Sequence, residues 1–440
     1  MSLLSAARAA CRRRVGPNPS LCAALGATRA MSTNPETATD VHARPSFPMM
    51  RPEASVPPEE YAKLRKTCPV SKAKLFDGSD IWLITKHRDL VDALRDQRFS
   101  KVRTHPDFPE LVEGAKAAVE GREPTFVDMD PPDWTRFRGM FERWFAGGYV
   151  EKLRPTIRGH VKELLDGMQR ASKPVNLHEA FSLPVAFKTI YGILGIPFED
   201  FEFLSNNIAM RSSGSSTARD AAAAQQELVD YMEKLVKEKE RNPGNDMLSE
   251  IVKNDLRNGN ISRDQLIAHA FLLVVAGNAT VASMINLGVV ELLANPDQLA
   301  AFKEDPEACA PGLALEICRF HSASALALRR VALEDVQLGG QTIRKNEGII
   351  ALNMSANRDE EVFRNADKFD IRRPEVGEQV AYGAGIHRCI AEYLALVELQ
   401  EAFKGLFGRF PNIKLAVDES ELEWSAPQAD VGLKSLPVTW

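Results

Sequence analysis

One cysteine of the chain lies where a reactive thiolate is expected. Cys389 follows the glycine-rich segment that begins at Tyr382 (YGAGIHRC) and precedes apolar residues at helical spacing, so the pattern predicts that Cys389 opens a helix. A thiol there meets unpaired backbone N–H groups and the positive end of the helix dipole, which both favour the thiolate. Such a thiolate is a natural axial ligand for haem iron. An inert cysteine after a glycine-rich turn explains the pattern equally well.

Glu316 and Arg319 (EICR) form a second pattern of interest, about seventy residues before Cys389. Residues three apart lie on the same face of a helix, so this carboxylate and guanidinium can pair. The spacing is common by chance, and most such pairs are solvated ion pairs at the surface. Its value therefore comes from its position upstream of the glycine-rich turn.

The third pattern is a long apolar segment that contains Gly277. Residues 262–295 carry apolar side chains at helical spacing, and Ser262 is a suitable N-cap. A glycine inside such a helix costs about 1 kcal/mol relative to alanine. That cost is easier to explain where another group approaches the backbone, although close packing of two helices explains it too.

The elements that must position these residues are mainly helices. Most of the chain after Trp134 has helical periodicity, whereas residues 81–85 and 330–350 have the pattern and turn chemistry of short strands. No repeat and no domain linker occurs after residue 60. We therefore expect one large, mainly α body with small β-sheets. The clearest helical patterns cover residues 87–96, 150–169, 218–240 and 262–295.

The charge is distributed unevenly along the chain. Residues 1–35 contain five Arg, no Lys and no acid, which is the composition of an organelle transit peptide. A disordered tail, or translation that begins at Met31, fits this composition too. We expect a mitochondrial location, with plastid or cytoplasm as alternatives. A proline-rich approach segment follows at 36–60, and residues 61–440 form the expected domain.

The composition excludes several classes of protein. Apolar residues make up 44% and charged residues 26% of the chain, as in soluble globular proteins. Without the five leader arginines the formal charge falls from −5 to −10, so nucleic acid is a poor candidate partner. No apolar run approaches the roughly 20 residues of a membrane span. The cysteines show neither CxxC nor zinc spacing, which indicates a reduced compartment without a disulfide framework.

Together, the three patterns resemble the cytochrome P-450 haem-thiolate family in order and spacing, over nearly all of residues 55–440. The resemblance implies the cytochrome P-450 fold in a single large domain, mainly α with small β-sheets, and a bound haem b. It implies that Cys389 is the axial ligand of the haem iron and that Glu316 and Arg319 form a buried structural pair. The residues that it places against the haem are Arg138, Arg330 and His387 at the propionates, and Ala276 and Gly277–Thr280 at the distal wall.

The chain departs from the family pattern at several positions. Trp134 stands where many members place a histidine that contacts a propionate, while Tyr382 replaces the usual Phe and Ala391 the usual Gly near the cysteine. The informative departure is Ala279. Oxygen-activating members usually carry Asp or Glu just before the distal Thr280 to help deliver protons for O–O cleavage, and this position here holds only a methyl group.

The chain is more similar to one branch of that family, the fungal-type nitric oxide reductases, which take hydride directly from NADH. The implied reaction is 2 NO + NADH + H⁺ → N₂O + NAD⁺ + H₂O. It cleaves no O–O bond, so it needs no acid beside Thr280 for that purpose. The segments that carry this resemblance are SKVRT (100–104), PTFVDMDPP (124–132), RSSGSSTAR (211–219), AGNAT (276–280), ASALAL (323–328), SANRDEEVF (355–363), HRCIAE (387–392) and ADVGL (429–433).

Direct hydride transfer requires that NADH or NADPH is held above the distal face of the haem. The chain has no GxGxxG after a strand, so a Rossmann domain is not the dinucleotide site. Charge-assisted contacts to a pyrophosphate are strong. The resemblance places Lys101, Arg103, Asp128 and Arg211 near the cofactor entrance, although their spacing alone also fits ordinary surface charge.

Proton supply in this interpretation falls, through waters, to Thr280, Ser324 and Asp430. Ser324 is equally well explained as a hydroxyl at a turn or helix end, and Asp430 as a solvated loop residue.

Two other functions stay open at this point. One is an O₂-dependent haem-thiolate monooxygenase that receives electrons from a separate ferredoxin or flavoprotein. The other is a non-catalytic haem-thiolate sensor that binds NO without turnover. A haem domain of about 400 residues leaves no room for a fused reductase. We expect a monomer that binds NO and a nicotinamide dinucleotide and needs no obligatory redox-partner protein.

Overall fold

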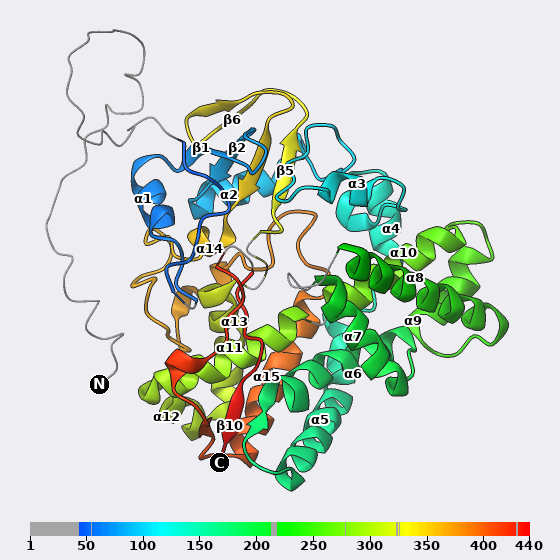
Figure 1. Cartoon of the computed structure of the whole chain (residues 1–440), viewed down its shortest axis with the longest axis vertical. Coiled ribbons are helices and arrows are strands. Elements are labelled where there is room, and N and C mark those ends of the chain that lie inside the picture. Colours follow the sequence, from blue (N-terminus) through cyan, green and yellow to red (C-terminus); the bar gives the residue numbers. More distant parts are fainter. Residues whose placement is uncertain are drawn as a thin grey trace, which may run out of the picture. The chain divides into compact units, whose positions relative to one another are not determined.

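The computed structural model describes residues 44–53, 55–212, 218–277, 279–322, 324, 326–427 and 430–440. The expected leader (1–35) lies outside these residues. Helices make up most of the described chain (Figure 1). In order they are α1 (Glu59–Thr67), α2 (His87–Arg95), α3 (Ala115–Val119), α4 (Asp133–Glu142), α5 (Gly147–Arg170), α6 (Leu183–Leu194), α7 (Phe201–Ser212), α8 (Ala218–Arg241), α9 (Met247–Ile251), α10 (Arg263–Ala276), α11 (Ala279–Ala294), α12 (Pro296–Glu304), α13 (Pro306–His321), α14 (Asn353–Ala356) and α15 (Glu392–Arg409).

The strands form three small sheets, and the strand predictions at 81–85 and 330–350 are confirmed. The largest has the order β1-β2-β8-β5-β3, with β2 and β8 parallel and the other neighbours antiparallel. Its strands are β1 (Val70–Lys74), β2 (Asp80–Ile84), β3 (Phe99–Ser100), β5 (Arg329–Ala332) and β8 (Gly348–Ala351). The others are β4 (Val175–Asn176), β10 (Pro437–Thr439) and β9 (Lys414–Leu415), and the pair β6 (Val336–Leu338) and β7 (Gln341–Ile343).

The long apolar segment is helical, as the sequence predicted, but it forms two helices, α10 and α11, because α10 ends at Ala276 with Gly277 as its C-cap. Ser262 caps α10 in a reciprocal capping box with Gln265. Helices α6, α13 and α15 pack against α11 (Figure 1). A Cβ at Gly288 of α11 would lie 2.2 Å from the ring of Phe403 on α15, so a glycine is required for this close approach. The packing makes α11 a core helix.

Taken together, α10 and α11 (residues 263–294) are the one helical stretch in the described chain that is long and apolar enough, by length and composition, to cross a membrane. The sequence analysis found no uninterrupted apolar run of that length. The other core helices pack around α11, which is the position of a core helix in a globular domain.

Candidate functional site

The loop that carries Cys389 is bent by two glycines. Gly383 and Gly385 have φ values of +75° and +71°, in the left-handed region that other residues disfavour. A Cβ at Gly385 would lie 2.3 Å from the carbonyl oxygen of Leu94, so only glycine lets the loop lie against the end of α2. The Cys389 N–H donates to the Tyr382 carbonyl oxygen at 3.0 Å and closes the bend.

Cys389 precedes a helix rather than opening one, which corrects the sequence prediction. α15 begins at Glu392, after a turn at residues 390–391. The side chain of Cys389 is accessible to solvent, yet burial raises its thiol pKa, and the Ala391 N–H and the Arg138 guanidinium act in the opposite direction. Both observations describe a side chain that faces an internal space. The expected lowering of the pKa is wrong for the protein alone, and a metal cation opposite the thiol would restore the thiolate.

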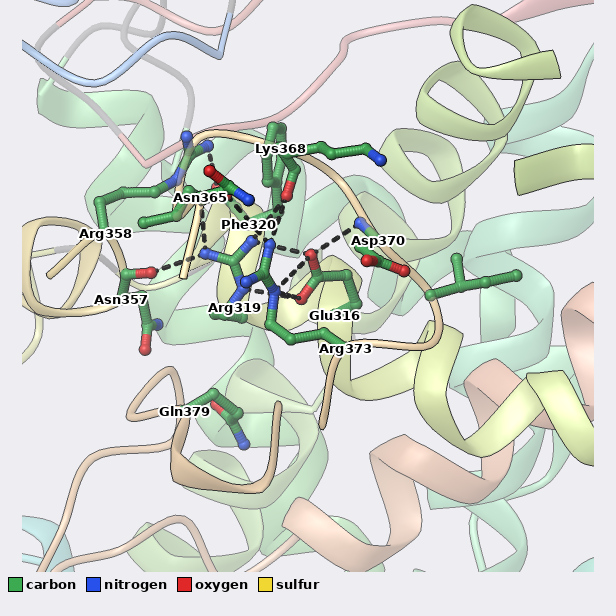
Figure 2. Close-up of polar contacts among 12 residues, drawn as sticks. Glu316, Arg319, Phe320, Asn357, Arg358, Asn365, Lys368, Asp370, Arg373 and Gln379 are labelled. Atoms are coloured by element: carbon green, nitrogen blue, oxygen red, sulfur yellow. Dashed lines mark hydrogen bonds and ion pairs between the residues drawn. The ribbon is translucent and has the colours of Figure 1, made fainter. Parts of the chain in front are cut away.

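Glu316 and Arg319 form an ion pair with no exposed surface (Figure 2). Arg319 donates to the two carboxylate oxygens of Glu316 at 2.7 and 2.8 Å. The guanidinium of Arg373 adds contacts of 3.2 Å to both oxygens, and the Asp370 N–H donates at 2.9 Å. The carboxylate is therefore fully hydrogen-bonded, which offsets the cost of burying its charge.

The Glu316–Arg319 pair is connected to the loop that leads to the cysteine. Arg319 donates to the Asn357 carbonyl oxygen at 2.7 Å (Figure 2). The Asn357 side chain in turn accepts from the Val380 N–H at 2.8 Å. This continuous set of bonds runs from α13 to the beginning of the Cys389 loop and holds the two in fixed relation.

Several side-chain nitrogens near Cys389 make no hydrogen bond in the described part of the chain, although Nε of Arg138 lies 3.6 Å from a Glu142 carboxylate oxygen in an ion pair. Nε of Arg138, Nε1 of Trp134 and Nε2 of His387 are buried and make no hydrogen bond within the described residues. Burial first, and then the charges of Arg330, Lys101 and Arg138, lower the pKa of His387 to about 2. Arg330 is itself only 2% exposed. Positive charge and unpaired donors thus converge at one place, which is the pattern that an anionic group would satisfy.

A second group of charged residues, here called the entrance cluster, lies beside this place. It consists of Lys101, Arg103, Glu110, Arg122, Asp128, Arg211 and Arg329.

Glu110 is shared by two arginines of the entrance cluster. Arg103 donates to its two oxygens at 2.7 and 2.9 Å, and Arg329 adds a contact of 2.5 Å. The exposed fractions of these three side chains lie between 10% and 22%, so the ion pairs are poorly screened by water. Glu110 therefore gathers Arg103 and the β5 residue Arg329 at one site.

Lys101 and Asp128 interact electrostatically at the centre of the entrance cluster. Burial, followed by repulsion from Arg330 and Arg329, lowers the pKa of Lys101 well below its usual value. Burial raises the pKa of Asp128, while Lys101, Arg103 and Arg122 oppose that rise. The charges of Lys101 and Asp128 therefore act on each other and on the neighbouring arginines.

Arg211 belongs to the edge of the entrance cluster. Its guanidinium lies 5.8 Å from the ring of Phe271 on α10, and its buried Nε has no hydrogen-bond partner in the described part of the chain. Burial lowers its pKa, and the charge of Arg122 lowers it further. Arg122 interacts in turn with Arg103 and Asp128, so Arg211 is connected electrostatically, through Arg122, to the other residues predicted for the cofactor entrance.

The comparisons with known proteins agree with this geometry. The family model for Cytochrome P450 matches residues 314–435. Cytochrome P450 55A3 of Fusarium lichenicola is 47% identical to this chain, over 90% of the chain and 97% of the relative. The chain belongs to the cytochrome P450 family. Cytochrome P450-SOY of Streptomyces griseus is 37% identical over 93% of the chain and 96% of its own length.

Solved structures of cytochromes P450 share the whole fold. The structure of GfsF has a TM-score of 0.85 at 34% identity and covers 90% of this chain and 100% of its own. The mycinamicin VIII C21 methyl hydroxylase MycCI of Micromonospora griseorubida has a TM-score of 0.84 at 34% identity, with the same coverage. The predicted fold, mainly α with small sheets in a single domain, is therefore confirmed.

Cytochromes P450 bind haem b, and the residues of this chain fit that group. The Cys389 thiol faces an internal space, as an axial ligand must. The buried guanidinium groups of Arg138 and Arg330, together with the His387 Nε2 that makes no hydrogen bond within the described residues, suit two propionate carboxylates. Trp134, which stands in place of the usual histidine, keeps a free indole N–H on the same side and lies 5.8 Å from the His387 ring.

The residues expected to form the distal haem wall lie at the junction of α10 and α11. Ala276 and Ala279 are exposed although most of the flanking helix is buried, and Thr280 donates its hydroxyl to the Ala276 carbonyl oxygen at 3.3 Å. A Cβ at Gly277 would lie 3.2 Å from the Leu273 carbonyl oxygen of its own helix and 3.8 Å from Ile190 of α6, so contact with the neighbouring helix does not require this glycine. The remaining residue of this segment, Asn278, lies outside the described residues.

The three residues predicted to supply protons lie on separate elements. The Ser324 carbonyl oxygen accepts from Asn353 at 3.4 Å, and the Asp430 carbonyl oxygen accepts from the Ser425 hydroxyl at 2.6 Å. These contacts join neither residue to Thr280. The chain just after Asp430 does reach α11, because a Cβ at Gly432 would lie 3.1 Å from the Ser283 hydroxyl.

The sequence analysis missed three members of the entrance cluster, namely Glu110, Arg122 and Arg329. Glu110 lies seven residues after Arg103, a separation that corresponds to no helical or strand spacing in this loop region. Arg329 precedes Arg330, which was assigned to a propionate, so the pattern RR at 329–330 was the available signal.

Proposed function

We propose that this cytochrome P450 is a nitric oxide reductase that takes hydride directly from NADH or NADPH. The observation that carries the proposal is the entrance cluster. Five cations and two carboxylates meet there, which leaves an excess of positive charge in a chain whose formal net charge is −5. Such an excess at a partly buried place suits an anionic ligand, and a dinucleotide pyrophosphate is one.

The haem, when bound, supplies the iron at which NO binds and is reduced. The contribution of the chain is to hold and orient the dinucleotide. Lys101, Arg103 and Arg211 are suited to bind the pyrophosphate, since cationic donors make strong, directional bonds to phosphate oxygens. Binding one partner of a bimolecular reaction in a fixed position converts the transfer into an effectively unimolecular step.

The distal wall also supports a reaction without O–O cleavage. Ala279 places a methyl group immediately before Thr280, so this position offers no carboxylate for proton delivery. The Thr280 hydroxyl donates its proton to the Ala276 carbonyl oxygen, and its oxygen stays available as an acceptor at the distal face. The similarity to fungal-type nitric oxide reductases agrees with the 47% identity to the Fusarium lichenicola protein.

An anaerobic assay without any reductase tests the proposal. Purified ferric protein is mixed with NO and NADH or NADPH, and dinucleotide absorbance and N₂O are followed together. The proposal expects one N₂O for each dinucleotide oxidised. An absence of dinucleotide oxidation would overturn it.

A monooxygenase is the second candidate, and one observation favours it. The chain keeps Thr280 at the distal wall, and relatives at about one third identity include Vitamin D3 dihydroxylase of Streptomyces griseolus and the MycCI hydroxylase. Addition of O₂, a ferredoxin and its reductase should then give hydroxylated product from an organic substrate, whereas NADH alone should give no turnover with NO.

We also propose that residues 1–35 direct the protein to mitochondria, because they combine five arginines with a complete absence of acids. A fluorescent protein fused behind these residues should reach mitochondria, and replacement of the arginines by glutamine should leave it in the cytoplasm. Plastid import, or no import, would reject the mitochondrial address.

A further inference from the structure

His269 lies in a closed aromatic cage on α10, beside the entrance cluster. Its ring is completely buried and stacks on Phe141 with centroids 5.0 Å apart and planes at 11°. Phe137 lies 5.2 Å away at 25°, and Phe126 lies 5.4 Å away at 33°. The cage joins α10 to α4, which carries Arg138, and to the short 3₁₀ turn Phe126–Asp128.

The two ring nitrogens of His269 have partners that determine its tautomer. Nδ1 lies 2.7 Å from the Gln265 carbonyl oxygen, which can only accept, so Nδ1 carries the proton. The backbone N–H of Phe126 can only donate, and it lies 3.2 Å from Nε2, which must therefore accept. Only the neutral ring with its proton on Nδ1 satisfies both partners.

The bond to Phe126 anchors one end of the segment that presents Asp128. The other end is held by Asp130, whose carboxylate accepts from the Ser100 hydroxyl at 2.5 Å and from the Lys101 N–H at 3.0 Å. Asp128 stands between these two anchors. The same segment thereby holds the residue that carries the Asp128 carboxylate and the backbone of Lys101, and the charges of these two side chains interact in the entrance cluster.

We propose that His269 is a positioning residue for the dinucleotide site: its neutral ring holds the Phe126 N–H and so sets Asp128 against Lys101 and Arg103. His269 touches neither the substrate nor the dinucleotide and acts only through the turn. The expected effect of His269 on the KM for NADH rests on the proposed function. The anchoring of the turn by the His269–Phe126 hydrogen bond does not depend on that function.

The test compares His269→Phe with His269→Gln in the haem-loaded protein. Phenylalanine keeps an aromatic ring in the cage but leaves the Phe126 N–H buried without an acceptor, whereas the glutamine carbonyl can accept. For His269→Phe we expect the KM for NADH to rise about 3- to 10-fold, the usual effect of one lost hydrogen bond. The kcat should stay within about twofold, and the affinity of the ferric protein for NO should not change. His269→Gln should recover much of the KM.

Amide hydrogen exchange of the peptide 124–130 gives a readout that is independent of turnover. The Phe126 amide should exchange slowly in the wild type and in His269→Gln, and faster in His269→Phe. His178→Phe is the matched control, because a ring nitrogen of His178 also bonds one amide, Asn286 Nδ2 at 2.8 Å. That variant should lose stability without a change in KM.

Three results would overturn the inference. The first is an unchanged KM and exchange rate in His269→Phe, and the second is an equal rise of KM in His178→Phe. The third is a loss of NO affinity, which would place His269 in the haem pocket instead. If His269→Phe does not fold, His269→Gln tests the inference alone. Its KM for NADH and its Phe126 exchange rate should be close to the wild-type values, and a clear departure of both would overturn the inference. Failure of the wild type to oxidise NADH with NO would reject the proposed function, and the exchange comparison would still decide whether His269 anchors the turn.

Discussion

The hydroxyl of Tyr382 lies 3.3 Å from the Sγ of Cys318 and joins the Cys389 loop to α13. Burial raises the pKa of Cys318 to about 12 and raises the pKa of Tyr382 as well, so both groups are neutral at physiological pH. The backbone carbonyl of Tyr382 accepts from the Cys389 N–H. One residue therefore contacts the neighbouring helix with its side chain and the cysteine with its backbone.

Tyr382→Phe should remove the first of these contacts and keep the second. The free energy of unfolding should fall by about 1 kcal/mol, the net value of an ordinary hydrogen bond. The absorbance spectrum of the thiolate-ligated haem should not change, because the carbonyl that bonds Cys389 remains. Chemical denaturation and absorbance spectroscopy measure the two effects, and Cys318→Ala serves as the partner control. A lost thiolate spectrum in Tyr382→Phe would show that the hydroxyl is needed for ligation.

Cys389→Ala should abolish the thiolate-ligated haem spectrum while the helical circular dichroism signal persists. The reason is that the side chain faces an internal space and makes no contact on which the core packing depends. Cys309→Ala is the control, since Cys309 is buried between helices with its Sγ 3.5 Å from the Ala301 carbonyl oxygen. An unchanged spectrum in Cys389→Ala would exclude Cys389 as the axial ligand.

Glu316→Gln should destabilise the protein by about 3–5 kcal/mol, because Arg319 and Arg373 would stay buried without a countercharge. Glu307→Gln on the same helix is the matched control. Glu307 pairs with Lys404, but its side chain is 79% exposed, so its loss should change the free energy by less than about 1 kcal/mol. Denaturant midpoints at constant m-value compare the two variants. Equal losses would mean that burial of the pair does not matter.

Arg103→Ala and Arg122→Ala should each raise the KM for the dinucleotide, by about tenfold for one lost charge-assisted contact. The two variants differ in side effects. Arg103→Ala also removes a partner of Glu110, whereas the Arg122 side chain makes no hydrogen bond or ion pair within the described residues. The KM of the wild type should rise with ionic strength. Arg372→Ala, at an exposed arginine outside the entrance cluster, should leave the KM unchanged.

Glu398 should make the stability of the protein depend on pH. Burial raises its carboxyl pKa to about 8, against a partial offset by a hydrogen bond with Thr189, and its exposed fraction is 3%. Between the unfolded pKa near 4.5 and the folded value, the folded state holds a proton that the unfolded state has released. The contribution of Glu398 to the free energy of unfolding is therefore fully present below about pH 4.5 and is lost as the pH rises towards 8.

Glu398→Gln should remove this slope and stabilise the protein at pH 8 by about 4 kcal/mol relative to the wild type. Unfolding free energies at pH 5, 6.5 and 8 measure the difference. Parallel pH profiles of the variant and the wild type would show that Glu398 does not titrate in this range.

The local parts of the site could be predicted from the sequence. Ser262 as the cap of a long apolar helix and the pairing of Glu316 with Arg319 depend on neighbours three residues away, and helix geometry alone determines such contacts. The glycines before Cys389 similarly indicated a bend. What the pattern predicted wrongly was the start of α15 and, with it, the pKa of the thiol.

By itself, then, the sequence determined the order of the helices and strands, the bend before Cys389 and the Glu316–Arg319 pair of α13. These features depend on steric effects and hydrogen bonds between residues that are close in sequence. Only the tertiary structure decided which charges meet. Arg103 and Arg329 share Glu110 although more than 200 residues separate the two arginines, and His269 anchors a turn that lies 143 residues away in sequence. Burial and electrostatic coupling depend on distances in space, and the spacing of residues along a chain does not contain those distances.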